Sequence, residues 1–368
     1  MAQELTRPKA GVLALTLELY ETLAPGLRGE REAWLRRKVL PALAKEADVV
    51  FEGAVFRRED VDRAVAGLEA QGVDAIVVIL LTYSPSQIAL PALKAARAPV
   101  FVWNTQELYA VDRGFDGPKM TANHGVHGTQ DLCNTLLRSG VAFEYATTHL
   151  DDANAVAPVG DFLRAAAAAR RLRSSRIGLM GYPFPGMGDF AVDTTQLAAT
   201  LGCQWIHLSV EDYIRRAEGA PAAEAAALAA EYGRLYAVAE GVTREELEAT
   251  ARAELALRGM ARDNRLDALT YQFMAFGEDE RTATLPFVAI SRMMAEGLGF
   301  GGEGDIIAAA GSALLSWLSP PATFSEIFTV DFAGDSLLMS HMGEANAAMA
   351  RPDRKTRLAA RPAPITRT

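Results

Sequence analysis

Cysteine is scarce in this chain of 368 residues, with Cys133 and Cys203 as the only two. They fall in different predicted units and form neither a CxxC motif nor a disulfide framework. Small secreted domains that depend on disulfides are rich in cysteine, so this class of protein is excluded. The cysteine content fits the reducing environment of the cytoplasm instead.

Long hydrophobic runs and an excess of basic charge are also missing. The longest apolar runs, such as Ala75–Leu81, have the length of a strand and are too short to span a bilayer. The amino-terminal MAQELTRPKAG lacks the apolar segment of a secretory signal. The formal net charge is −9, whereas a protein that binds nucleic acid needs a basic face. These absences predict a cytoplasmic protein with neither a membrane nor a nucleic acid as its partner.

Predicted strands and helices alternate along the chain. Continuous apolar runs at Gly11–Leu17, Asp74–Leu81 and Pro99–Trp103 predict strands that are buried on both faces of a sheet. Between the first two, Arg58–Gln71 carries apolar residues at helical spacing. Another apolar run, Arg176–Gly181, starts a second series. Half of the residues are hydrophobic, which gives ample core for a globular protein of this length.

This alternation predicts an α/β fold with open, mostly parallel, doubly wound sheets. We expect a Rossmann-like domain at residues 1–172 and a second one at residues 173–325. Residues 326–368 are expected to form a β-ribbon and tail, the start of a truncated C-terminal domain. One large sheet is the alternative architecture.

Three polar loops follow or adjoin the predicted strands of the first domain. They are Thr82–Gln87, Asn104–Tyr109 and Asn123–Asp131. Ligands of doubly wound sheets bind beyond the carboxyl ends of the strands, so these loops are candidate binding loops. Each could instead be a turn in which Ser or Thr caps the next helix. None contains GxGxxG or a P-loop, so no motif supports a nucleotide as ligand.

A glycine-rich loop in the last quarter of the chain is followed by clustered ionisable residues. Glu303 and Asp305 precede an apolar helix, where the helix dipole favours acids. Asp331 and His341 lie at the ends of two β-rich runs that follow. Carboxylates and an imidazole are ligands for Mn²⁺ or Mg²⁺. Equally, Glu303 could cap its helix, Asp331 could hydrogen-bond a turn, and His341 could be a satisfied strand-end histidine.

The order of these motifs resembles the L-arabinose/L-fucose isomerase superfamily. The resemblance is carried along nearly the whole chain by TYSPSQ, WNTQELY, NHGVHGTQD, YPFPGMGDF, GFGGEGD, VDF and SHMGEAN. Known members look like two Rossmann-type domains followed by a β-rich C-terminal domain, assembled as hexamers or related oligomers. They use Mn²⁺ to interconvert an aldose and a ketose through an enediol.

The resemblance assigns expected roles to single residues. Glu303 matches the glutamate that binds the metal and moves a proton, Asp331 matches the second acidic ligand and acid/base residue, and His341 matches a histidine ligand. His127 matches a histidine that, in some members, reaches a substrate bound in the neighbouring subunit.

Two further residues complete the expected contacts with substrate. They are Gln106, in the WNTQELY loop, and Glu18, which follows the first strand. The resemblance therefore implies a homo-oligomer, a trimer or a hexamer, that binds an unphosphorylated pentose or deoxyhexose.

The expected function is that of an aldose–ketose isomerase that uses Mn²⁺, or else Mg²⁺ or Co²⁺. The alternative is a sugar-binding or regulatory homologue that has lost turnover. Arabinose isomerases supply a further histidine ligand from the C-terminal domain, and this sequence stops at Thr368. Weak metal binding is therefore expected, unless Glu344, Asp335 or a neighbouring chain completes the coordination shell.

Overall fold

The computed structural model describes residues 7–277 and 279–360. These residues divide into two compact units, residues 7–170 and residues 171–360, and helix α8 (Ala157–Ser174) runs from the first into the second. Residues 326–360 belong to the second unit. The division of the sequence at residue 172 and the separate segment 326–368 stay predictions, and residues 361–368 lie outside the described residues.

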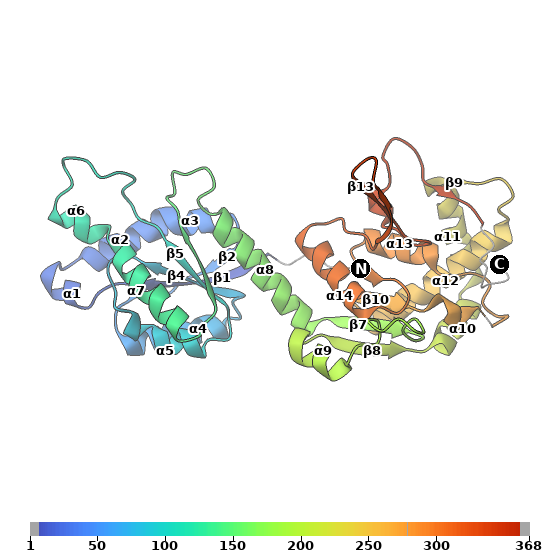
Figure 1. Cartoon of the computed structure of the whole chain (residues 1–368), viewed down its shortest axis with the longest axis horizontal. Helices are drawn as coiled ribbons and strands as arrows, with labels where there is room; N and C mark the ends of the chain where they lie inside the picture. Colours follow the sequence, from blue (N-terminus) through green and yellow to red (C-terminus); the bar gives the residue numbers. More distant parts are fainter. Residues whose placement is uncertain (1–6, 278, 361–368) are drawn as a thin grey trace. The chain divides into compact units, whose positions relative to one another are not determined.

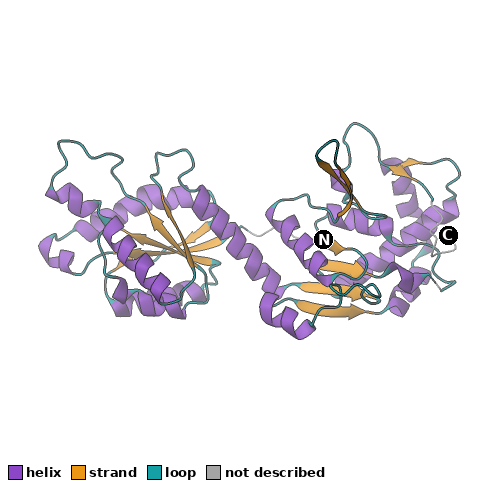
Figure 2. Cartoon of the chain, in the orientation of Figure 1, coloured by secondary structure: helices purple, strands orange, loops and turns teal. Residues whose placement is uncertain are grey.

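The first unit is built on a parallel sheet with the strand order β2-β1-β4-β5-β6, and a short strand, β3, also pairs with β1. Its strands are β1 (Lys9–Leu15), β2 (Asp48–Val50), β3 (Ala54–Val55), β4 (Ala75–Leu80), β5 (Val100–Asn104) and β6 (Phe143–Thr147). The three strands predicted from apolar runs are thus the three central ones. Each is buried because helices cover both faces of the sheet (Figures 1 and 2).

Successive side chains of β1 enter two different cores. Val12 and Ala14 pack with the helical segment that comprises α2 (Leu27–Trp34), a π-helical turn (Leu35–Val39) and α3 (Leu40–Leu43), and with α8. Leu13 and Leu15 pack on the opposite face, with α4 (Arg58–Ala70), α5 (Leu90–Ala95) and α7 (Gly125–Arg138). This alternation follows from the two-residue period of a strand, and it confirms the predicted doubly wound α/β fold.

Helix α7 begins within a segment that the sequence predicted to be a loop. Most of Asn123–Asp131 is helical, because α7 begins at Gly125. Glycine at position 128 lets this helix approach the loop after β4 closely. A Cβ atom on Gly128 would lie 2.8 Å from the carbonyl oxygen and 2.9 Å from the amide nitrogen of Ser84. The contact depends on the tertiary fold, which local sequence patterns do not report.

Replacing Gly128 with Ala is expected to destabilise the first unit by about 1–3 kcal/mol, because the added methyl group overpacks a contact between two backbones. Gly233 in α11 (Ala222–Leu235) is the matched control, since among the described residues no atom outside its own helix lies within 4 Å of the position of its Cβ. Its replacement by Ala should be neutral or stabilising by up to about 1 kcal/mol. Urea unfolding of the two variants measures both effects, and equal midpoints would contradict the prediction.

The second unit contains a four-stranded parallel sheet with the order β11-β10-β7-β8. Its strands are β7 (Arg176–Met180), β8 (Gln204–Leu208), β10 (Ala268–Tyr271) and β11 (Gly299–Gly301). The chain passes from β7 outward to β8 and later returns to β10 on the other side of β7. The strand order therefore reverses between β7 and β10, which is where ligands bind in sheets of this kind.

Helices cover this second sheet as well. A large core joins the sheet to α10 (Val210–Glu218), α12 (Arg244–Asp263) and α13 (Phe287–Ala295), while α14 (Ile306–Leu318) packs on β10 and β11. Thr243 and Glu246 form a capping box at the start of α12. Helix α9 (Thr194–Leu201) adjoins β8.

Two short ribbons complete the second unit. An antiparallel hairpin joins β12 (Glu326–Asp331) to β13 (Ser336–Ser340), close to the two β-rich runs that the sequence predicted. A second pair joins β9 (Ala237–Val238) to β14 (Arg357–Leu358). Among the residues that the structure describes, no helix is both long and apolar enough to cross a membrane.

Candidate functional site

Glu303 lies in the tight loop between β11 and α14, over the carboxyl ends of β10 and β7. Its backbone has a φ of 59°, an uncommon conformation for a residue with a side chain. The next residue, Gly304, donates from its amide to Thr270 Oγ1 at 3.0 Å and packs against the backbone of Tyr182 and Pro183. Asp305 caps α14 through an amide hydrogen bond from Ala308 at 2.9 Å. The loop thus holds the Glu303 side chain at the point where the strand order reverses.

The carboxyl group of Glu303 is half-buried beside another acid. Burial raises its pKa above the ordinary value, the nearby carboxylate of Glu326 raises it further, and His341 opposes both effects. The alternative in which Glu303 caps α14 is wrong, because Asp305 is the capping residue of this helix. Glu303 is free for interactions on the side of Glu326 and His341.

His341 joins two carboxyl groups, one at each ring nitrogen. Hydrogen bonds connect Nδ1 to Glu326 Oε2 at 3.0 Å and Nε2 to Glu344 Oε2 at 2.9 Å. The ring of Phe324 packs edge-on against the imidazole, with centroids 4.8 Å apart. A Cβ atom on Gly302 would lie 3.1 Å from the imidazole, so the glycine leaves room for the ring. The imidazole of His341 is thus held by two hydrogen bonds and by the ring of Phe324.

Glu344 is the most buried acid of this group, with 3% of its surface exposed. Burial raises its pKa to about 8. Its Oε1 accepts a hydrogen bond from the hydroxyl of Tyr271, at the end of β10. We refer to Glu303, Glu326, His341, Glu344 and Tyr271 as the Glu303 cluster.

The structure does not bring Asp331 into the Glu303 cluster. The hairpin pairs Glu326 with Ser340 at its open end and Asp331 with Ser336 at its turn. The length of β12 therefore separates Asp331 from His341 by about 17 Å, at 3.4 Å per residue. Asp331 accepts amide hydrogen bonds from Ala333 and Gly334 at 3.1 and 2.9 Å, which is the turn-forming role given as its alternative.

Local sequence patterns do not mark Glu326 or Tyr271, and they offer Glu344 only as a replacement ligand. The predicted strand began at Ile327, one residue after Glu326. Pairing the two runs as an antiparallel hairpin would have placed Glu326 opposite the end of the second run, beside His341. Tyr271 is far away in the sequence, and no local pattern links it to Glu344.

The Glu303 cluster has an excess of acid over base. Among the described residues, no lysine or arginine forms an ion pair with Glu303, Glu326 or Glu344. Within the same residues, no three acidic, histidine or cysteine side chains are arranged as a ready metal site. His341 Nδ1 and Glu326 Oε2, two potential metal-ligand atoms, are hydrogen-bonded to each other at 3.0 Å. A cation between them would replace that bond.

The three predicted substrate residues lie in the first unit. Glu18 follows β1 and accepts a hydrogen bond from Arg57 Nε at 2.7 Å. Gln106 follows β5 and donates from Nε2 to the carbonyl of Leu108 at 2.7 Å. His127 is exposed in the first turn of α7. Their predicted roles stay predictions.

The loops that follow β1, β4 and β5, at the carboxyl ends of the strands of the first sheet, contain buried hydroxyl groups without a hydrogen-bond partner among the described residues. Thr16, Ser84 and Thr105 have side-chain oxygens that make no hydrogen bond to the described residues. Nearby, the hydroxyl of Tyr20 and Nε2 of His124 are 2.9 Å apart, and the rings of His124 and His127 lie 5.7 Å apart. Burial and His127 lower the pKa of His124. This edge is polar, as the three loops predicted.

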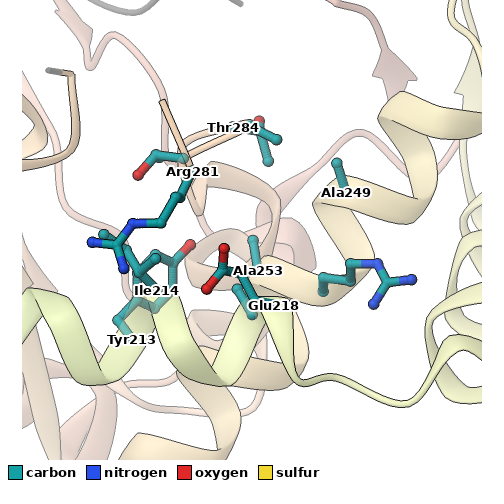
Figure 3. A pocket seen from close by; sticks show the side chains of 11 residues that line it. Tyr213, Ile214, Glu218, Ala249, Ala253, Arg281 and Thr284 are labelled. Carbon is teal, nitrogen blue, oxygen red and sulfur yellow. The ribbon is translucent and has the colours of Figure 1, made fainter. Parts of the chain in front are cut away.

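A separate pocket opens between α10, α12 and the loop at residues 281–284 (Figure 3). Its apolar wall comes from alanine and isoleucine side chains, and Glu218, Arg252 and Arg281 add charge. Arg281 is already paired with Glu211 and Asp279, both at 2.7 Å. The pocket shares no residue with the Glu303 cluster.

Comparisons with known proteins agree with the resemblance found in the sequence. Residues 186–319 match the family model of the L-arabinose isomerase central domain. An L-arabinose isomerase of Arthrobacter sp. is 30% identical over 328 residues, which are 84% of this chain and 63% of the relative. The enzyme of Mycolicibacterium smegmatis is 30% identical over 292 residues, 75% of this chain and 56% of the relative. That of Geobacillus kaustophilus is 27% identical over 332 residues, 84% of this chain and 63% of the relative.

The chain spans less than two thirds of the length of these relatives. Among solved structures, a periplasmic solute-binding protein from Actinobacillus succinogenes with bound D-allose covers 90% of this chain and 96% of its own. Its sequence identity is 14% and its TM-score is 0.19, so this similarity has no bearing on function. By sequence, the chain is related to the L-arabinose isomerases over most of its length, and residues 186–319 correspond to their central domain.

Proposed function

We propose that this chain carries the catalytic centre of a metal-dependent isomerase that interconverts an unphosphorylated aldose and ketose. The observation that carries the proposal is the Glu303 cluster, which gathers carboxyl groups and one imidazole without a neutralising lysine or arginine among the described residues. It lies at the reversal point of a doubly wound sheet, within and beside the segment related to the L-arabinose isomerase central domain.

The donor set fits a divalent cation such as Mn²⁺, Mg²⁺ or Co²⁺. Glu303, Glu326 and His341 would hold the ion, because carboxylate oxygen and imidazole nitrogen are ligands that these ions accept. In this proposal Glu326, and not Asp331, is the second acidic metal ligand. A bound divalent cation would supply Lewis-acid polarisation of the sugar carbonyl. Three protein ligands leave further coordination positions for water or sugar hydroxyls.

Glu303 is the residue best suited to move the proton. Isomerisation shifts a proton between C1 and C2 of the sugar through an enediol, and a base with a pKa near the working pH does this most efficiently. Burial and the neighbouring Glu326 both raise the pKa of Glu303 in that direction. Its backbone is held by the loop, in which Gly304 donates to Thr270 Oγ1 at 3.0 Å.

The relatives suggest the class of substrate and the setting of the reaction. Their names make L-arabinose the first sugar to test, followed by other pentoses and deoxyhexoses. We also propose a cytoplasmic homo-oligomer in which His127 reaches the sugar bound by a neighbouring chain, with Gln106 and Glu18 as further contacts with the sugar. Sedimentation at micromolar concentration tests the assembly, and a monomer would contradict it.

Turnover is tested by incubating the Mn²⁺-loaded chain with the sugar panel and separating aldose from ketose by chromatography. A ketose product supports the proposal. Thermal stabilisation by a sugar without any product would instead favour the second candidate, a sugar-binding or regulatory homologue. No stabilisation and no product would contradict both functions.

The choice of Glu326 over Asp331 is tested by two matched variants. Glu326→Gln is expected to weaken Mn²⁺ binding and lower turnover by at least about 10–100-fold, since changes outside the first coordination shell already cost that much. Asp331→Asn should leave both unchanged, because asparagine can still accept the two turn hydrogen bonds. Calorimetric titration and the chromatographic assay measure the two effects. A larger loss of Mn²⁺ binding and turnover in Asp331→Asn than in Glu326→Gln would show that Asp331, and not Glu326, is the ligand.

A further inference from the structure

A row of hydrogen bonds leads from the interior of the second unit to its candidate metal site. The hydroxyl of Tyr271 donates to Glu344, Glu344 Oε2 meets His341 Nε2 at 2.9 Å, and His341 Nδ1 meets Glu326 Oε2 at 3.0 Å. Exposure rises along the row, since Tyr271 and Glu344 are buried, His341 is nearly buried, and Glu326 is partly exposed. The row therefore has an inner end at Tyr271 and an open end at Glu326.

The inner end of the row is unusual because it places a carboxyl group in an apolar core. Tyr271 itself packs between the rings of Phe276 and Phe300, at centroid distances of 5.7 and 5.6 Å. A buried carboxyl group costs free energy unless its oxygens are hydrogen-bonded. Both oxygens of Glu344 are bonded, one to Tyr271 and one to His341. Tyr271 and His341 thus satisfy both oxygens of the buried carboxyl group.

We propose that Tyr271 and Glu344 are positioning residues that fix the imidazole of His341 with Nδ1 turned toward Glu326. The inference rests on the proposed function, because it gives the fixed ring its purpose as a ligand. Tyr271 anchors Glu344 from β10, and Glu344 in turn holds Nε2. The edge contact with Phe324 restricts the ring from the side. Only Nδ1 is left to face the open end of the row.

The arrangement matches the physical requirement for a histidine ligand. A histidine that binds a metal through one nitrogen commonly has its other nitrogen hydrogen-bonded to a carboxylate, which sets the orientation of the ring. Glu344 is suited to that task and Glu326 is not, because Glu326 lies on the side where the ion would bind. Tyr271 acts one step further back, through Glu344.

The test compares Tyr271→Phe and Glu344→Gln with Tyr213→Phe, a buried tyrosine of the same unit whose side chain lines the separate pocket. Nitrogen NMR of metal-free, histidine-labelled protein reports the His341 ring, assigned with the help of His341→Gln. We expect one sharp set of ring signals in the wild type, shifted or broadened signals in the first two variants, and no change in Tyr213→Phe. Circular dichroism checks that each variant is folded.

Mn²⁺ titration by calorimetry gives a second, independent readout. Affinity should fall about 10–100-fold in Tyr271→Phe and in Glu344→Gln, and it should stay at the wild-type value in Tyr213→Phe. Unchanged ring signals in folded Tyr271→Phe and Glu344→Gln would overturn the inference. A wild type with a fixed ring that binds no Mn²⁺ and turns over no sugar would contradict the proposed function while leaving the positioning of His341 by Tyr271 and Glu344 supported.

Discussion

Replacing Glu303 with Gln is expected to lower the turnover of the preferred sugar by about 10²–10⁴-fold, the usual contribution of a general acid–base residue. Glutamine has nearly the same shape as glutamate, but its amide cannot accept and return the proton. The loop should keep its structure, because Gly304 and Asp305 make the hydrogen bonds that hold it. The measurement is kcat with saturating sugar and Mn²⁺.

Asp305→Asn is the matched control, since it removes a carboxylate only two residues away. Asp305 caps α14, and among the described residues its side chain makes no hydrogen bond or ion pair with the Glu303 cluster. Asparagine is an equally good cap. We expect wild-type turnover and stability in this variant. If Glu303→Gln retained more than about a tenth of the wild-type kcat, a residue other than Glu303 would have to move the proton.

Replacing Glu254 with Ala is expected to destabilise the second unit by about 3–5 kcal/mol, the range found when one partner of a buried ion pair is removed. Glu254 is fully buried in α12. Its Oε1 accepts from Arg258 Nε at 2.8 Å and from Arg292 Nε at 2.9 Å, and its Oε2 accepts from the hydroxyl of Tyr232 at 2.7 Å. The substitution would leave these donors without a shared acceptor and would also open a cavity.

Glu248→Ala on the same helix is the control for this effect. Glu248 pairs with Arg244 at 2.7 Å, but the side chain of Arg244 is mostly exposed. Such a surface pair contributes only about 0.3–0.5 kcal/mol. Urea unfolding followed by circular dichroism compares the two variants. Similar midpoints for Glu254→Ala and Glu248→Ala would show that the network on α12 stabilises no more than a surface ion pair.

The secondary structure of this protein follows closely from local sequence patterns. Gly11–Leu17, Asp74–Leu81 and Pro99–Trp103 correspond to β1, β4 and β5 within two residues at each end. Buried parallel strands need apolar side chains on both faces, so each one appears in the sequence as a short, continuous apolar run. The prediction was poorer at Asn123–Asp131, where a helix begins among polar residues and glycines and Gly128 lies against Ser84.

The candidate site was predictable only in part, for a reason of geometry. Glu303 and His341 could be selected because residue type and motif order mark them, and both lie near the same carboxylate, Glu326. Asp331 was selected on the same grounds, yet the hairpin places it at the turn. A sequence lists residues along the chain, whereas hairpin register decides which of them end side by side.

By itself, the sequence determined the α/β class, the buried strands and the kinds of side chain that the glycine-rich segment carries. These depend on local hydrophobic period and on the nature of the side chains. The tertiary structure alone decided that Glu326 stands beside His341, that Asp331 does not, and that Tyr271 holds Glu344 from another strand. Such contacts join residues that are distant along the chain, and only the packing of β10, the Gly302–Gly304 loop and the β12–β13 hairpin brings them together.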